Sequence, residues 1–215
     1  MGMMGSVFLI PIFTQTFLGY NATESGFLFM PMAICMMIFA AIGGTFTGKI
    51  KSKYVIYIST TIAAFGLSLF CFLDPKSKAW EVVIPLCIMA AGMGLGMAQR
   101  TSVVASVVKS SEMGIASSVL ALARSIAGAF GIAVFSTILN NRIEHNVLVI
   151  NKFSHFLGST AADLQTYIGL ITIKAEINAY HYVFLVSTIV VGLGAFTILT
   201  LKLKNEESKN KIISQ

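Results

Sequence analysis

The chain has 215 residues, of which 56% are hydrophobic and only 11% are charged, and its formal net charge is +6. Its mean hydropathy is +0.82. Because soluble domains carry roughly 25% charged residues, this composition excludes an ordinary soluble domain and predicts a protein whose main partner is the lipid bilayer. The positive charge is not interleaved with aromatic residues in a basic patch, so no nucleic-acid partner is expected.

Apolar runs long enough to cross a bilayer, which takes about 20 residues, recur along the whole chain. They are continuous and too long for barrel strands, which alternate and need only about 10 residues each. We therefore predict an all-α membrane protein, a six-transmembrane-helix bundle over residues 1–203, followed by a cytoplasmic tail at 204–215. The predicted spans cover about residues 2–19, 27–47, 54–73, 82–107, 115–139 and 182–203.

The segment 140–181 between the last two predicted spans is much longer than a helix-to-helix turn requires. Ile143 and Val147 are one turn apart and share a helix face. Thr160 and Asp163 have the spacing of an approximate capping box, which predicts a second helix start. We therefore expect an outer hairpin of two short helices.

The spacing of His145, His155 and His181 with Glu144 fits no compact set of metal ligands, so no metal site is predicted. The predicted spans also hold no nucleophile paired with a base. We therefore expect neither an enzyme nor a bound cofactor.

Basic residues are unevenly shared between the predicted connections. One side of the membrane receives nine of them and the other side five. Because cytoplasmic loops carry an excess of Lys and Arg, the side with nine basic residues is predicted to be cytoplasmic. The protein is therefore expected in the cell (inner or plasma) membrane, with its C-terminus in the cytoplasm. The nine are Lys49, Lys51, Lys53, Arg100, Lys109, Lys202, Lys204, Lys209 and Lys211.

Small residues recur at one-turn spacing on several predicted spans. Lipid supplies no hydrophobic force between helices, so small residues mark places where two backbones approach closely. The third and sixth spans have fewer of them and are predicted to face lipid, while the other four are predicted to enclose a cavity. The predicted packing residues are Gly44, Gly48, Gly92, Gly96, Gly128 and Gly131, with a ridge of Ser117, Ala121, Ser125, Ala129 and Ala133.

The notable polar side chains inside the predicted spans are those of Gln15, Gln99, Arg100 and Arg124. An arginine in the bilayer is costly unless it is paired or hydrated, so Arg124 is expected to face a helix seam or a cavity. It serves either as an interhelical anchor or as a substrate contact. Arg100, at the end of its span, is predicted to be an anchor at the inner membrane edge.

Methionines also form a one-face stripe, at Met89, Met93 and Met97. Methionine is a flexible gap-filler in cores and an adaptable surface in promiscuous cavities. Both interpretations stay open, and Met93 is kept as a cavity candidate.

Three segments resemble the EmrB/QacA-type drug:proton antiporters, the fourteen-span branch of the major facilitator superfamily. "PIFTQTFLGYNATESGFLFMP" is similar to that family's ninth and tenth spans. "GMGLGMAQR" and "ASSVLALARSIAGAFGIAVFSTILNNR" are similar to its twelfth and thirteenth spans. The resemblance implies that this chain is one of two pseudo-symmetric bundles, joined by an N-terminal half outside this sequence, in an exporter of amphipathic or cationic compounds in exchange for protons.

The resemblance also implies site residues. By position, Gln15 and Met30 are candidates for the cavity wall, and Arg124 matches an arginine of the thirteenth-span pattern. Two features depart from the family. The turn "GKIKSKY" lacks an acidic residue, and no Asp or Glu lies in the six predicted spans, although proton coupling requires a titratable group in the membrane.

Two other functions stay open at this stage. The chain could be a non-transporting membrane protein with an assembly or regulatory role. It could also be a six-span transporter of another solute that acts as a homodimer.

Overall fold

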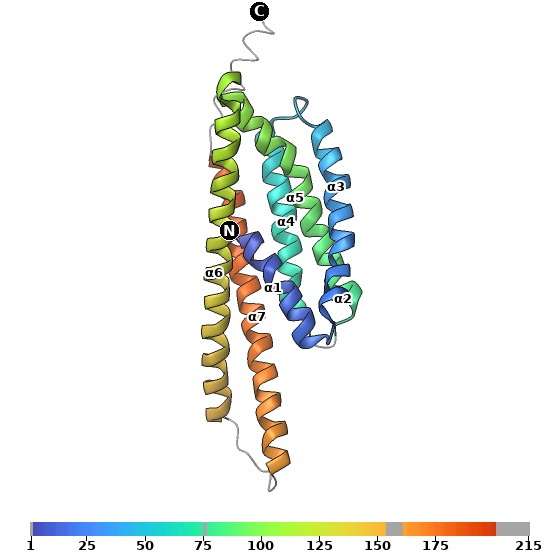
Figure 1. The fold of residues 1–215 in the computed structure, drawn as a ribbon, viewed down its shortest axis with the longest axis vertical. Helices are drawn as coiled ribbons and strands as arrows, with labels where there is room; N and C mark the ends of the chain where they lie inside the picture. The colour runs from blue at the N-terminus through green and yellow to red at the C-terminus, as the bar shows by residue number, and fades with distance from the viewer. Residues whose placement is uncertain (1, 75–76, 154–160, 201–215) are drawn as a thin grey trace, which may run out of the picture.

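The computed structural model describes residues 2–74, 77–153 and 161–200. These residues form an elongated bundle of helices (Figure 1), and no strand occurs in the described part. The all-α fold class is confirmed. The elements are α1 (Gly2–Phe17), α2 (Ala22–Phe27), α3 (Phe29–Thr45), α4 (Ser52–Leu69), η1 (Phe70–Phe72), α5 (Ala79–Val107), η2 (Ser110–Glu112), α6 (Met113–Phe153) and α7 (Ala161–Thr200).

Five helical stretches are long and apolar enough to cross a membrane: Ala22–Thr45, Ser52–Phe72, Ala79–Ala105, Met113–Val149 and Gly169–Ile198. The predicted first span is shorter than expected. Helix α1 has 16 residues, about 24 Å, against a hydrocarbon core of about 30 Å. It ends before Gly19, whose φ of 69° is the left-handed conformation that glycine favours.

The second predicted span begins earlier than residue 27, because α2 leads into α3. Asn21 and Glu24 form a capping box, in which the Glu24 amide donates to Asn21 Oδ1 over 2.8 Å and the Asn21 amide donates to Glu24 Oε2 over 2.9 Å. This box fixes the start of α2. The sequence prediction missed it because the apolar run itself starts only at Phe27.

The outer hairpin predicted at 140–181 is not built of separate short helices. Its residues extend α6 and α7, which have 41 and 40 residues and are each about 60 Å long. Both helices therefore project beyond a hydrocarbon core of about 30 Å, at the lower end of the bundle in Figure 1. The capping box predicted from Thr160 lies outside the described residues.

Two contacts hold the projecting parts of α6 and α7 together. The Arg142 guanidinium lies over the Tyr182 ring, 3.8 Å from its centroid. The Asn146 side-chain amide donates to the Ala175 carbonyl over 3.1 Å. These contacts explain why the helices continue as a pair.

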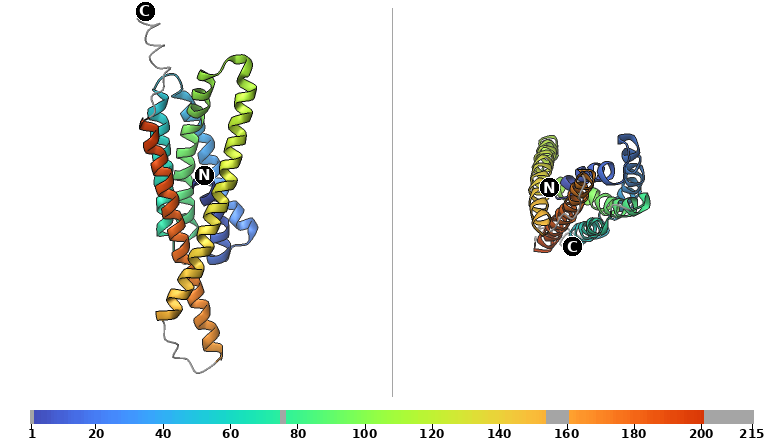
Figure 2. Two further views of the ribbon diagram at one scale, coloured as in Figure 1. Left: turned by 90° about the vertical axis from the view of Figure 1, so that its left-hand side faces the viewer. Right: turned by 90° about the horizontal axis from the view of Figure 1, so that it is seen from below.

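The helices contact one another in the order α3, α5, α4, α7, α6, and α1 packs against α6 and α7. The end-on view of Figure 2 shows α3 and α6 on opposite sides of this arrangement. The expectation that the third and sixth predicted spans, which correspond to α4 and part of α7, face lipid stays a prediction, and Phe65 of α4 and Leu193 of α7 are exposed, at 58% and 62%. Helix α4 lies between α5 and α7 and buries Ser59, Ala63 and Leu67 completely, because one apolar face of an outer helix still has to pack inward.

Glycines let α5 approach α3 and α4 on opposite faces. A Cβ at Gly92 would lie 2.5 Å from the Ala63 amide nitrogen and the Ser59 carbonyl oxygen of α4. A Cβ at Gly94 would lie 2.5 Å from the Met36 carbonyl oxygen of α3. Two residues turn an α-helix by about 200°, so Gly92 and Gly94 point in nearly opposite directions.

The other predicted packing glycines divide into two groups. Gly96 lies against Ser59 of α4, and the Gly131 backbone lies against Gly5 of α1. Gly44 has open space around it, and its neighbour Gly43 makes the contact with the Leu95 backbone instead. Two others do not pack closely: Gly48 lies past the end of α3 with φ of 82°, and Gly128 meets only the Met4 side chain, at 3.8 Å.

We predict that Gly92→Leu lowers the amount of folded protein in membranes. The leucine would meet backbone atoms, which cannot rotate away, so the overpacking cost of about 1–3 kcal/mol is a lower estimate. Gly192→Leu on α7 is the matched control, since a Cβ at Gly192 has no atom within 4 Å. Fluorescence-detected size-exclusion chromatography of tagged protein measures both, and equal monodisperse yields would contradict this account of the α4–α5 seam.

Candidate functional site

A buried amide joins three segments at the end of the bundle that holds the α3–α4 turn. We call this the lysine-rich end, because Lys49, Lys51 and Lys53 lie in or beside that turn. Gln99 of α5 is fully buried there. Its Nε2 donates to the Gly43 carbonyl over 3.3 Å and to Thr47 Oγ1 over 3.1 Å.

The other half of the Gln99 amide is also used. Its Oε1 accepts a hydrogen bond from the Ser52 hydroxyl over 3.1 Å. Both Nε2 hydrogens and the oxygen are thus engaged, as a buried polar group requires. The amide links the end of α3, the start of α4 and the middle of α5.

Arg100, the next residue, points into the bundle along α4. Its Nη2 donates to Thr60 Oγ1 over 3.1 Å, and the Thr60 hydroxyl donates in turn to the Ile56 carbonyl over 2.7 Å. A Cβ at Gly96 would lie 3.1 Å from Arg100 Nη2, so the missing side chain at Gly96 leaves room for the guanidinium. The role predicted for Arg100, an anchor at the inner membrane edge, stays a prediction beside this hydrogen bond.

Arg124 of α6 is exposed on the surface of the chain. It lies eleven residues beyond Met113, about 16 Å along the helix. Arg100 and Arg124 thus come from α5 and α6, which pack against different neighbours.

The remaining predicted cavity residues are not gathered around one enclosed space. Gln15 of α1 is exposed, and Met30 of α3 is 58% exposed. Met93 of α5 is half-buried and packs against the hydrophobic core, as a gap-filling methionine would. Instead, the side chains of Gln15, Met30 and Arg124 are all exposed on the surface of this chain.

The small-residue ridge of α6 is open as well. Its five members are all exposed, whereas the glycines of α5 are covered by neighbouring helices. Among the described residues, the ridge therefore has no helix packed on it. The ridge consists of Ser117, Ala121, Ser125, Ala129 and Ala133.

The described carboxylates lie near helix ends and turns. Glu144 of α6 and Glu176 of α7 are the exceptions that change a prediction, because they fall inside the apolar stretches Met113–Val149 and Gly169–Ile198 rather than in separate outer helices. The second stretch, of 30 residues, is about 45 Å long, so part of it extends beyond the hydrocarbon core. Glu176 lies in the part nearer the projecting hairpin.

Sequence reasoning singled out Gln99 and Arg100 but missed the hydroxyl partners Thr47, Ser52 and Thr60. These partners are 40 to 52 residues away along the chain. The sequence shows only that Thr47 and Ser52 flank the lysine-containing turn. Hydroxyl residues are common in turns, so this position does not predict a hydrogen bond to Gln99.

The five long apolar helices define a polytopic membrane protein. The profile of the Major Facilitator Superfamily matches residues 1–132. The chain belongs to this superfamily, which is a family of transporters and not of enzymes.

Similar proteins include drug exporters. Multidrug transporter protein MdtP of Bacillus subtilis is 31% identical over 166 residues, which cover 77% of this chain and 30% of that protein. The MFS-type efflux transporter ffsH of Aspergillus flavipes is 27% identical, over 93% of this chain and 37% of that protein. Multidrug resistance protein 3 of Bacillus subtilis is 26% identical, over 88% and 40%. The chain thus spans only 30 to 40% of the length of these relatives.

We predict that Gln99→Leu destabilises the protein. The change removes three hydrogen bonds, while the Gly43 carbonyl still accepts from the Phe46 amide, and each lost bond costs about 0.5–1.5 kcal/mol. The thermal unfolding temperature in detergent should fall. Gln15→Leu is the matched control, because Gln15 is exposed and should leave that temperature unchanged. Equal unfolding temperatures for the two variants would show that Gln99 does not tie the helices together.

Proposed function

We propose that this chain is the C-terminal bundle of a fourteen-span, EmrB/QacA-type drug:proton antiporter. The whole protein exports amphipathic or cationic compounds by alternating access. The N-terminal bundle is a further part of the transporter, encoded in the same reading frame or as a separate chain. The substrate cavity lies between the two bundles, as in other transporters built from repeats.

The observation that carries this proposal is the exposure of Arg124. An arginine near the middle of a lipid-facing helix costs about 2.5–3.5 kcal/mol even on permissive insertion scales. A second bundle packed on the small-residue ridge of α6 removes that cost, since it replaces lipid with a polar or hydrated wall. Gln15 and Met30 belong to the same wall of the cavity.

The proposal also assigns the proton-coupling carboxylate. Glu24, Glu81 and Glu112 lie in the first turns or connections of their helices, and Glu144 and Glu176 lie toward the projecting ends of α6 and α7, away from Arg124. We therefore place the coupling carboxylate in the N-terminal bundle, opposite Arg124. The lysine-rich end is placed on the cytoplasmic side of the cell membrane, because its turn alone carries three lysines.

The test is export of ethidium, an amphipathic cation, by the full-length protein in cells that lack their own major exporters. We expect efflux that stops when an uncoupler collapses the proton gradient. Arg124→Ala should lower the initial efflux rate at least about tenfold, because a charge-assisted hydrogen bond is worth about 1.5–3 kcal/mol. Arg124→Lys should retain part of the rate.

Lys109→Ala is the control, since Lys109 is an exposed cation in the α5–α6 connection. It should leave the rate unchanged. Full efflux by Arg124→Ala at wild-type abundance would contradict the role of this residue. Efflux that continues after the uncoupler would exclude proton exchange, and function of the 215-residue chain alone as a dimer would favour the homodimeric transporter.

A further inference from the structure

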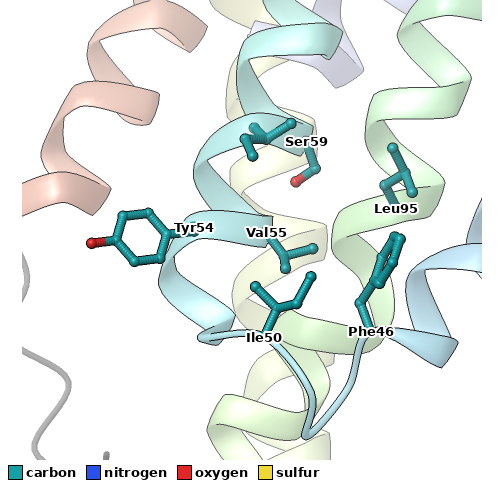
Figure 3. Close-up of a pocket in the computed structure, with 7 residues that line it drawn as sticks. Phe46, Ile50, Tyr54, Val55, Ser59 and Leu95 are labelled. Carbon is teal, nitrogen blue, oxygen red and sulfur yellow. The ribbon is translucent and has the colours of Figure 1, made fainter.

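A small apolar pocket opens at the lysine-rich end. It lies between the α3–α4 turn, the first two turns of α4 and the part of α5 around Leu95. Its volume is about 200 Å³. Figure 3 shows Phe46 and Ile50 from the turn, Val55 from α4 and Leu95 from α5 converging on it, while Tyr54 is turned outward.

The walls of this pocket select an apolar occupant. Ser59 supplies a hydroxyl, but that hydroxyl already donates to the Ile56 carbonyl over 2.9 Å. The other lining groups are hydrocarbon except for the outward-facing Tyr54. A drug-sized ligand needs about 300–1,000 Å³, so the pocket fits a narrower object such as part of an alkyl chain.

The chain around the pocket is positively charged. Lys49 and Lys51 flank the lining residue Ile50, Lys53 precedes the lining residue Tyr54, and no acidic residue occurs in the sequence between Glu24 and Asp74. Lysines next to a membrane-spanning helix attract anionic lipid headgroups. The outward Tyr54, which is 53% exposed, suits the headgroup level where tyrosine is enriched.

We propose that this pocket is a binding site for an anionic phospholipid. One acyl chain enters between Phe46, Val55 and Leu95, and the headgroup phosphate lies against the three lysines. Gly48, whose φ is 82°, lets the chain turn between the lining residues Phe46 and Ile50. A bound lipid therefore fastens the α3–α4 turn to α5, next to the Gln99 hydrogen bonds. This inference does not depend on which solute the protein carries.

The test titrates the detergent-solubilised full-length protein with dioleoyl phosphatidylglycerol or dioleoyl phosphatidylcholine and follows bound lipid by native mass spectrometry. We expect tighter binding of phosphatidylglycerol. Replacing Lys49, Lys51 and Lys53 together with Gln should weaken it by about fivefold for each lysine, on the order of 100-fold in all. Replacing Lys78, Lys109 and Lys174 together with Gln removes the same charge elsewhere and should change the affinity much less.

A second pair of variants tests the acyl chain. Ile58→Trp should fill the pocket and weaken binding of both lipids, whereas Ile189→Trp on α7 should not, although both isoleucines are about half exposed, at 54% and 52%. Glycerol phosphate, which is the headgroup without chains, should not compete. Equal effects of the two lysine triples, or competition by glycerol phosphate at the affinity of the lipid, would overturn the proposal.

Photocrosslinking of the unmodified protein decides the matter if a variant does not fold. Phosphatidylglycerol with a diazirine in its acyl chain should label peptides within residues 46–59. Labelling confined to other peptides would overturn the assignment of the pocket.

Discussion

The buried amide of Gln99 fixes the geometry of one half of the bundle. Lipid gives helices no hydrophobic reason to associate, so contact rests on close backbone packing and on hydrogen bonds that have no competing water. Gln99 supplies bonds to the Gly43 carbonyl, Thr47 and Ser52 at one level of the bundle. Helix α5 can hold α3 and α4 together because its glycines allow both neighbours to come close before these bonds form.

This constraint divides the bundle into two parts of different character. Helices α3, α5 and α4 share glycine seams and the Gln99 bonds, whereas α6, α7 and α1 meet through the Gly5–Gly131 contact and large side chains such as Phe135 and Phe184. The two parts join where α4 packs on α7. Helices α3 and α6 therefore form the two outer edges, and their exposed faces are available to the second bundle that we propose.

The sequence predicted helices and small-residue seams well but not the partners across them. Gly92 and Gly96 were placed on a packing face, yet nothing local to them names Ala63 and Ser59 as the atoms they meet. Gly44 was chosen one residue away from Gly43, and one residue turns a helix by about 100°, which moves a contact off the seam. The helix that the Ile143–Val147 spacing predicts was not joined to the preceding span because the polar residues Asn140, Asn141 and Arg142 end the apolar run.

The sequence could single out Arg124 as a functional candidate, but it could not distinguish an interhelical anchor from a substrate contact. Its place in an apolar run signals a cost that some partner must offset. Thr60 is neutral and hydrogen-bonds only Arg100, so within residues 2–74, 77–153 and 161–200 no ion pair offsets either guanidinium. A negative group opposite Arg124, from a second bundle or from a bound solute, would therefore neutralise its charge. Binding or release of that group would shift the equilibrium between two packed arrangements of the bundles.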